Sequence, residues 1–257
     1  MPNFEDIAMT VSGAVARITV TRPHKLNAYR NETADELRAA FSDAEQDPAV
    51  RVAVLTGEGR AFGAGYDLAT VAPDEVPQLD TVLERHFNPL ILQMRQSRLP
   101  IITAVNGPCA GAAVGVALAG DIVLASSAAY FYEPFVGIAL VPDLGNTLFL
   151  PRMIGRVRAT GMMLLGERLA AEEAERWGLV WQVTAPEALG GEVDRVAAKL
   201  AGLPPEAVAT TKRLIGAGGE AGLEAQLGME RDAQGEAGRS PAMRAAVAAF
   251  FAARKTG

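Results

Sequence analysis

The sequence is poor in the residues that build disulfides, metal sites and polyanion-binding surfaces. Its 257 residues include one cysteine and two histidines, so an internal disulfide is impossible and no metal site is expected. Lysine and arginine number 24 against 30 acidic residues, for a net charge of −6, and no window concentrates basic side chains. The N-terminal segment has neither the basic nor the apolar stretch of a signal peptide. These shortages argue against nucleic acid as a partner and favour a cytoplasmic location.

An uninterrupted hydrophobic run is also missing. Residues 101–125 are the most apolar stretch, with Asp121 as the one charge, and about 20 apolar residues can span a membrane. The Asn106-Gly107-Pro108 turn and the scattered glycines instead predict a buried strand, a turn and a helix. We therefore expect no membrane partner.

What the sequence does contain is an alternation of strand and helix patterns. Residues 14–21 alternate and are β-branched, 31–47 place apolar residues at helical spacing with Asn31 and Thr33 as candidate caps, and 50–56 form another apolar run. This order predicts a βαβ unit with parallel strands. The next segments predict a mobile, acidic loop over 73–80, helices over 83–95 and 110–119, and strands over 101–105 and 121–125.

The sequence becomes helical after Pro151. Helical patterns recur over residues 159–165, 170–177, 187–200, 205–215, 223–235 and 242–253. A run of strands and crossovers followed by helices predicts an α/β fold, with a core over residues 1–195 and a helical C-terminal region over residues 196–257.

Two glycine- and alanine-rich turns follow predicted strands, at residues 57–68 (GEGRAFGAGYDL) and 106–115 (NGPCAGAAVG). Small residues let a ligand approach the backbone closely, and amides at a helix N-terminus attract negative charge. Two such turns facing each other would form an oxyanion hole, a pair of N–H groups that stabilises charge on an oxygen. The same glycines also suit tight turns and close helix packing, so this pattern alone leaves both interpretations open.

Four ordered segments resemble the crotonase, or enoyl-CoA hydratase/isomerase, family: Arg22-Pro23 with Asn27-Ala28, AFGAGYDL, AVNGPCAGAAVGVALAGDIVLA and IALVPDLG. The segments LLGERLAAEEAERWGLVWQV and LGMERDAQGEAGRSPAMRAAVAAF resemble the branch that contains 2-(1,2-epoxy-1,2-dihydrophenyl)acetyl-CoA isomerase. The resemblance covers essentially the whole chain. It implies a crotonase-like spiral of ββα turns and a homotrimer or dimer of trimers, with the C-terminal helices contributing to assembly. It also implies an acyl-CoA substrate and no cofactor, because coenzyme A is part of the substrate.

The resemblance further implies roles for residues of the two turns. A thioester carbonyl would lie between the backbone amides of Tyr66 and Ala112, and the phenol of Tyr66 would not be needed. The expected substrate-binding positions are Lys25, Leu26, Ala28, Ala64, Gly65, Asp67, Leu68 and Gly111, with the adenine against the backbone near residues 25–26 and 67–68.

The resemblance also implies that Asp143, in Val141-Pro142-Asp143, is the acid/base, because it matches the acid/base of several isomerase branches of the family. The family's hydratases hold a water between two glutamates, and Gly115 and Phe135 stand at those positions here. One carboxylate suffices to move a proton between two carbons, and apolar neighbours should raise its pKa toward neutrality. The alternative is a structural role, in which Asp143 caps a helix predicted to begin at Gly145.

Glu133 is a second candidate for the pocket, with a surface or subunit contact as its alternative. Residues 71–87 are expected to build the acyl pocket, and Phe87 and Leu90 are expected in its wall or in the core. The predicted function is acyl-CoA isomerisation, either of a 3-enoyl to a 2-enoyl thioester or of a ring-epoxide phenylacetyl-CoA. Two alternatives remain: an enoyl-CoA hydratase or thioester hydrolase that uses Asp143 and Glu133, and a CoA-binding homologue without activity.

Overall fold

The structure is a computed structural model that describes residues 4–70, 78–219 and 221–253. The chain divides into two compact units, Met1–Ala201 and Gly202–Gly257. The expected boundary after residue 195 falls inside helix α8 (Leu189–Ala201). That helix belongs to the first unit along its whole length, because Leu200 and Ala201 still pack against the apolar cluster on the sheet.

The first unit is an α/β fold built on a six-stranded sheet in the order β1-β2-β3-β4-β6-β9. The strands are β1 (Ile7–Ser12), β2 (Val15–Val20), β3 (Val52–Gly57), β4 (Ile101–Val105), β6 (Ile122–Ser126) and β9 (Gln182–Thr184). All neighbouring pairs are parallel except β1 and β2. The predicted βαβ unit is thus confirmed. Strand β1 was not expected, and it reaches β2 through Gly13, whose φ of +57° permits the tight turn.

Helix α1 (Asn31–Gln46) makes the crossover from β2 to β3, as the apolar spacing predicted. Its buried face includes Ala34, Leu37 and Phe41. The N-cap is Arg30 rather than Asn31, and the Thr33 hydroxyl accepts the Arg30 N–H at 3.1 Å. The sequence therefore placed the helix correctly. Of the two candidate caps, Thr33 makes a capping hydrogen bond from inside the first turn, whereas Asn31 is the first helical residue and not the cap.

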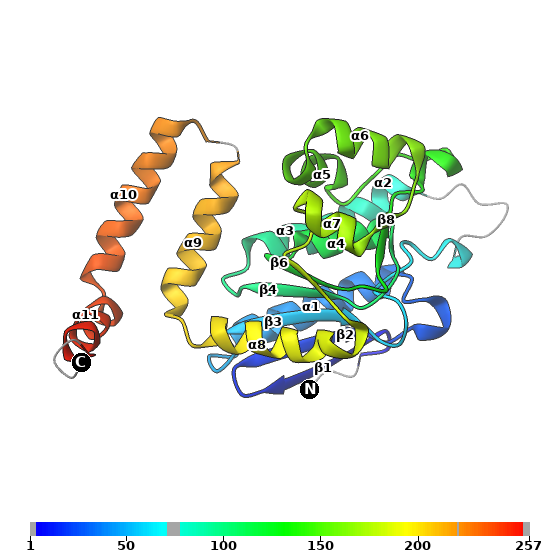
Figure 1. Cartoon of the computed structure of the whole chain (residues 1–257). Helices are drawn as coiled ribbons and strands as arrows, with labels where there is room; N and C mark the ends of the chain where they lie inside the picture. Colours follow the sequence, from blue (N-terminus) through cyan, green and yellow to red (C-terminus); the bar gives the residue numbers. More distant parts are fainter. Residues whose placement is uncertain (1–3, 71–77, 220, 254–257) are drawn as a thin grey trace. The chain divides into compact units, whose positions relative to one another are not determined.

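Helical layers cover both faces of the sheet, and α8 lies across one of them (Figure 1). Because successive strand residues point to opposite faces, Ala53 and Leu55 join the core beneath α1, α3 (Asn88–Gln96) and α4 (Ala112–Ala119). Val52 and Val54 point the other way and contact α8. This alternation explains why β3 is apolar along nearly its whole length.

A second, three-stranded sheet carries the glycine-rich turn at residues 106–115. Its strands are β5 (Cys109–Ala110), β7 (Tyr130–Tyr132) and β8 (Leu169–Ala170), in the order β5-β7-β8. None was predicted, because two or three residues are too few to show a period. The remaining elements of this unit are η1 (Pro23–Lys25), η2 (Leu68–Thr70), α2 (Leu79–Val82), the π-helix η3 (Leu83–Phe87), η4 (Phe135–Ile138), α5 (Asn146–Ile154), α6 (Arg156–Leu165), α7 (Ala171–Trp177) and η5 (Pro186–Ala188).

The expected helix over 83–95 is divided into η3 and α3. Of the acidic loop expected over 73–80, residues 73–77 lie outside the described residues, and Leu79 and Asp80 belong to helix α2 instead. The apolar run at 101–125 forms β4, β5, α4 and most of β6, as the interruption by glycine and proline indicated. Among the residues that the structure describes, no helix is long and apolar enough to cross a membrane.

The second unit consists of α9 (Pro205–Gly218), α10 (Leu223–Arg239) and α11 (Pro241–Ala253). Helices α9 and α10 run side by side in opposite directions (Figure 1). Large apolar side chains such as Ile215, Leu223 and Phe250 are exposed on these helices. The predicted helical C-terminal region is present in these residues.

Candidate active site

A cavity of about 150 Å³ lies in the first unit where the two glycine-rich turns meet. Its lining comprises Ala64, Gly65, Tyr66, Leu68, Leu79, Val82, Leu83, Phe87, Gly111, Ala112, Pro134, Phe135, Ile138, Leu140, Asp143 and Leu144. The lining is mostly apolar, and Asp143 is the one carboxylate among these described residues. The cavity therefore joins the predicted acid/base to both predicted amide donors.

A short backbone ladder orients the turn that contains Tyr66. The N–H of Tyr29 donates to the Gly65 carbonyl at 2.7 Å, and the N–H of Asp67 donates to the Tyr29 carbonyl at 2.8 Å. Successive peptide groups of an extended segment point to opposite sides, so the N–H of Tyr66 points away from Tyr29. In the described part of the chain this N–H has no acceptor. It is available to a ligand.

The second turn brings the N-terminus of α4 to the same space. Gly111 is its N-cap with a φ of +56°, and its own N–H donates to the Tyr132 carbonyl at 2.8 Å. The next N–H, that of Ala112, opens the helix and lacks an intrahelical acceptor. At Gly65, whose φ is +91°, a Cβ would lie 3.6 Å from the Ala112 nitrogen. The bare backbone at Gly65 therefore leaves room for an atom beside that N–H.

Asp143 reaches the cavity from an unusual turn. Leu144 follows it with a φ of +49°, a left-handed conformation that leucine rarely adopts, and Gly145 continues with a φ of +83°. The Asp143 Oδ1 is buried and has no hydrogen-bond partner among the described residues. Burial raises the pKa of Asp143 to about 6. The capping role is wrong, because α5 begins at Asn146 with Gly145 as its N-cap.

Glu133 is fully buried, with 0% exposure, so a surface position is excluded. Both of its carboxyl oxygens lack a hydrogen-bond partner in the described residues. Burial first, and the charge of Asp143 second, raise the pKa of Glu133 to about 9. Its neighbours Pro134 and Phe135 line the cavity, whereas Glu133 is absent from the described lining. It is thus a neutral acid at pH 7 that lies close to Asp143 without facing the cavity.

The two positions that hold glutamates in the family's hydratases cannot hold a carboxylate here. At Gly115 a Cβ would lie 2.6 Å from the Leu144 Cβ and 2.7 Å from the Leu144 carbonyl oxygen, so the site has no space for a side chain. At the other position the buried ring of Phe135 lines the cavity. Neither position can hold or activate a water.

Of the positions expected to contact the nucleotide, Leu68 lines the cavity, whereas Lys25, Leu26 and Asp67 are not in the described lining, and neither is Ala28. Lys25 is exposed at the end of η1, and Leu26 turns the chain with a φ of +52°. Ala28 is buried, and its carbonyl accepts a hydrogen bond from Arg22. The Asp67 carboxylate accepts from Arg22 at 2.8 Å. Burial is the largest single influence and raises the pKa of Asp67, but the hydrogen bonds from Arg22 and from the Ala69 N–H, together with the charges of Arg22 and Lys25, outweigh it and lower the net pKa.

Within the described part of residues 71–87, the segment expected to build the acyl pocket, several side chains do line the cavity. Leu79, Val82 and Leu83 line it from α2 and η3, and no motif marked these residues. Phe87 lies both in the pocket wall and in the core, because it lines the cavity and is almost fully buried. Its ring packs edge-on against that of Tyr66, with 5.9 Å between the ring centroids. Leu90 is a core residue with no exposure.

Comparison with known proteins agrees with this geometry. The sequence model of the family described as "Enoyl-CoA hydratase/isomerase" matches residues 10–257. The "1,2-epoxyphenylacetyl-CoA isomerase" of Escherichia coli is 40% identical over 254 residues, which is 98% of this chain and 97% of that protein. A "Probable enoyl-CoA hydratase" of Rhodobacter capsulatus is also 40% identical, over 252 residues and the same shares.

The fold also matches that of a solved structure. The enoyl-CoA hydratase/isomerase from Cupriavidus metallidurans CH34 superimposes with a TM-score of 0.91 at 31% identity, covering 98% of this chain and 95% of that one. The chain therefore belongs to the enoyl-CoA hydratase/isomerase family, and its fold is the crotonase fold. Because the relatives at 40% identity include an isomerase and a hydratase, the reaction has to be argued from the site.

Proposed function

We propose that this protein is an acyl-CoA isomerase in which Asp143 carries the proton. The observation that supports it best is the cavity lining, where Asp143 is the one carboxylate among the described residues and the Tyr66 and Ala112 amides are the available donors. A hydratase of this family needs two carboxylates on a water, and Gly115 and Phe135 supply none.

The proposed steps for a 3-enoyl thioester balance without water. The Asp143 carboxylate removes a proton from Cα, and the electron pair moves onto the thioester oxygen to form a dienolate. The N–H groups of Tyr66 and Ala112 stabilise that oxygen. The protonated Asp143 then returns the proton to Cγ, which leaves the double bond between Cα and Cβ.

The electrostatics of the cavity fit such a base. With a pKa of about 6, Asp143 is ionised at neutral pH yet is a stronger base than an ordinary aspartate. The apolar walls from Leu83, Phe87 and Leu140 keep water away from the dienolate. Coenzyme A would lie along the backbone near residues 25–26 and 67–68 as part of the substrate, and no further cofactor is needed.

Two acyl groups are compatible with this chemistry. One is a linear 3-enoyl chain. The other is a ring-epoxide phenylacetyl group, which the name of the Escherichia coli relative favours. The oxyanion donors and the acid/base are the same for both.

A hydratase is the second candidate, and Glu133 is the observation in its favour, because this second carboxyl interacts electrostatically with Asp143. Its absence from the described cavity lining weighs against a water held between the two groups. A CoA-binding homologue without activity is the third candidate.

The deciding experiment incubates the protein with a 3-enoyl-CoA in deuterated water. The 2-enoyl product is followed by absorbance and its label by mass spectrometry, with Asp143→Asn beside the wild type. Asp194→Asn is the matched control, since Asp194 is exposed on α8 and pairs with Arg17. We expect conversion in the wild type and control and none in Asp143→Asn.

Other outcomes would select the rivals. A 3-hydroxyacyl-CoA product would support the hydratase. Conversion of a ring-epoxide phenylacetyl-CoA alone would narrow the isomerase to that substrate. Thioester binding without turnover of either substrate would support the non-catalytic homologue.

A further inference from the structure

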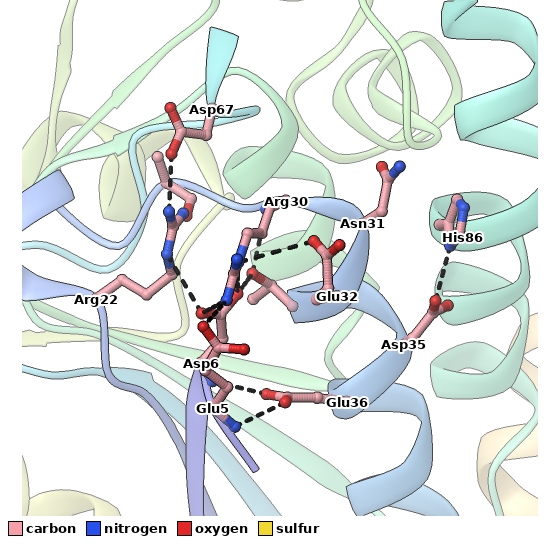
Figure 2. A network of polar contacts seen from close by, with 12 residues as sticks. Glu5, Asp6, Arg22, Arg30, Asn31, Glu32, Asp35, Glu36, Asp67 and His86 are labelled. Carbon is pink, nitrogen blue, oxygen red and sulfur yellow. Dashed lines mark hydrogen bonds and ion pairs between the residues drawn. The ribbon is translucent and has the colours of Figure 1, made fainter. Parts of the chain in front are cut away.

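A buried ion network lies behind the turn that presents the Tyr66 N–H. Asp6 is almost fully buried and is shared by two arginines. Arg30 contacts it with Nε at 2.7 Å and Nη2 at 2.9 Å, and Arg22 places Nε 3.4 Å from Asp6 Oδ1. Figure 2 shows the two guanidinium groups on either side of Asp6, with Arg22 extending on to Asp67.

Arg22 contacts both segments of the backbone ladder, one through each terminal nitrogen. Its Nη2 donates to the Asp67 carboxylate at 2.8 Å, and its Nη1 donates to the Ala28 carbonyl. Ala28 immediately precedes Tyr29 and Asp67 immediately follows Tyr66. One guanidinium thus joins the two residues that flank the Tyr29–Tyr66 bridge.

The backbone of Arg22 is anchored as firmly as its side chain. Its N–H donates to the Asn27 side-chain oxygen at 3.0 Å, and the Asn27 amide nitrogen donates to the carbonyls of Ala61 at 2.7 Å and Glu58 at 2.9 Å. Asn27 has no exposure and holds a φ of +55°. The hydrogen bonds of Asn27 connect residues 22–29 to the start of the 58–67 loop, and those of the Arg22 side chain connect them to its end.

A guanidinium is suited to this place because its donors project in fixed, coplanar directions. Arg22 uses separate nitrogens for Asp6, Asp67 and Ala28. The single nitrogen of a lysine cannot reach three such acceptors at once. Loss of Arg22 would also remove the guanidinium that pairs with the buried Asp67 carboxylate.

We propose that Arg22 is a positioning residue that aims the Tyr66 N–H at the thioester oxygen. The inference rests on the oxyanion role proposed for Tyr66. Arg22 does not line the described cavity and acts through the Ala28 and Asp67 segments. Arg30 supplies the contrast, because among the described residues its side chain pairs with Glu5, Asp6 and Glu32, and none of these lies in either flanking segment.

The test compares Arg22→Met and Arg22→Lys with Arg30→Met. Each substitution removes a guanidinium from the shared Asp6, so all three should lower the thermal midpoint. A misaimed N–H lowers transition-state stabilisation, and we expect kcat for the 3-enoyl-CoA to fall about 10- to 100-fold in both Arg22 variants. Arg30→Met should keep kcat within about threefold of the wild type, since its contacts leave the ladder intact.

A second readout measures carbonyl polarisation without turnover. The absorbance of a conjugated 2,4-dienoyl-CoA moves to longer wavelength when donors polarise its thioester carbonyl. The wild type and Arg30→Met should give the same red shift, and the Arg22 variants a smaller one at similar affinity. Asp67→Asn, which keeps an acceptor for Arg22, should retain more of the shift than Asp67→Ala.

The outcomes separate this inference from the proposed isomerase function. Equal kcat and equal red shifts in the Arg22 and Arg30 variants would overturn the positioning role. So would the absence of any red shift in the wild type. A red shift that depends on Arg22 in a protein that isomerises neither substrate would keep the positioning role and reject the isomerase. If Arg22→Met does not fold, Arg22→Lys and the two Asp67 variants make the same comparison.

Discussion

At the residue scale, the ionisation of Asp143 predicts how the rate depends on pH. Its pKa is raised to about 6, and a base acts only when ionised, so kcat should rise with pH through about 6 and level off above it. Asp143→Asn should lose about 100- to 10,000-fold of the rate at the plateau. Initial rates between pH 4.5 and 8 measure both effects, and a flat wild-type profile over this range would remove Asp143 from the role of base.

Glu133 predicts a pH dependence of stability. Its pKa in the folded chain, about 9, exceeds its ordinary value of 4.5, so the folded state binds more protons than the unfolded state between these limits. Stability should therefore fall as pH rises, by up to about 1.4 kcal/mol per pH unit. Glu133→Gln mimics the neutral acid and should flatten this slope.

Urea unfolding at pH 6.5 and 8.5 tests the Glu133 prediction, because Asp143 has largely finished titrating by then. The wild type should lose more stability between these two pH values than the variant. Parallel losses in both proteins would mean that Glu133 is already ionised in the folded state at pH 6.5.

Gly115 tests the contact between α4 and the catalytic turn. A methyl group there would meet Leu144 at 2.6 Å, so Gly115→Ala should displace the turn that carries Asp143. We expect a loss of about 1–3 kcal/mol in unfolding free energy, as overpacking usually costs, together with a lower kcat. Gly161→Ala in α6, where the added methyl meets nothing within 4 Å, is the control and should be neutral or stabilising. Equal behaviour of the two variants would contradict the close contact.

At the scale of elements, α8 and the catalytic turns lie on opposite faces of the sheet, which separates stability from activity. Leu189 is buried in the apolar cluster formed by α8 with β3, β4 and β6. Leu189→Ala should cost about 2–5 kcal/mol of unfolding free energy and leave kcat unchanged in the remaining folded protein. Denaturant titration and kcat measurements on Leu189→Ala check this, with Leu92→Ala, a change at an exposed leucine of α3, as the control. A loss of kcat in Leu189→Ala that the control does not show would mean that α8 supports the site.

The elements that the sequence predicted share a clear property, which is length. Strands β2, β3 and β4 and helix α1 are long enough to show their periods, and their positions were predicted to within about two residues. Strands β5, β7 and β8 have two or three residues, and their pairing depends on partners far along the chain. A helix from Gly145 was considered in the sequence, and α5 begins one residue later, but its start is defined by the left-handed turn at Leu144 and Gly145 rather than by a capping side chain of Asp143.

At the scale of the whole molecule, the exposed apolar side chains predict self-association. They occur in both units, among them Leu165 and Trp181 in the first and Leu223 and Phe251 in the second. Scattered exposed leucines are ordinary, but so many large apolar side chains are typical of surfaces that become buried in an assembly. The homotrimer or dimer of trimers stays a prediction, and sedimentation should give three or six times the 27.0 kDa of one chain. A monomer at micromolar concentration would contradict it.

The sequence by itself determined the alternation of strands and helices and the two glycine-rich turns, whereas the choice of Asp143 came from the resemblance to a family. These features depend on neighbours within a few residues, so periodicity and small side chains are enough to indicate them. The resemblance to a family then ordered them into a site.

Only the tertiary structure decided what those segments do together. Gly65 and Gly111 had to be brought face to face before their turns could present two N–H groups to one cavity. Arg22 and Asp67 are 45 residues apart, and nothing in their local sequence shows that one guanidinium joins them. The burial that raises the pKa of Glu133 is likewise a property of the packed interior, because desolvation depends on every segment that excludes water from the carboxyl group.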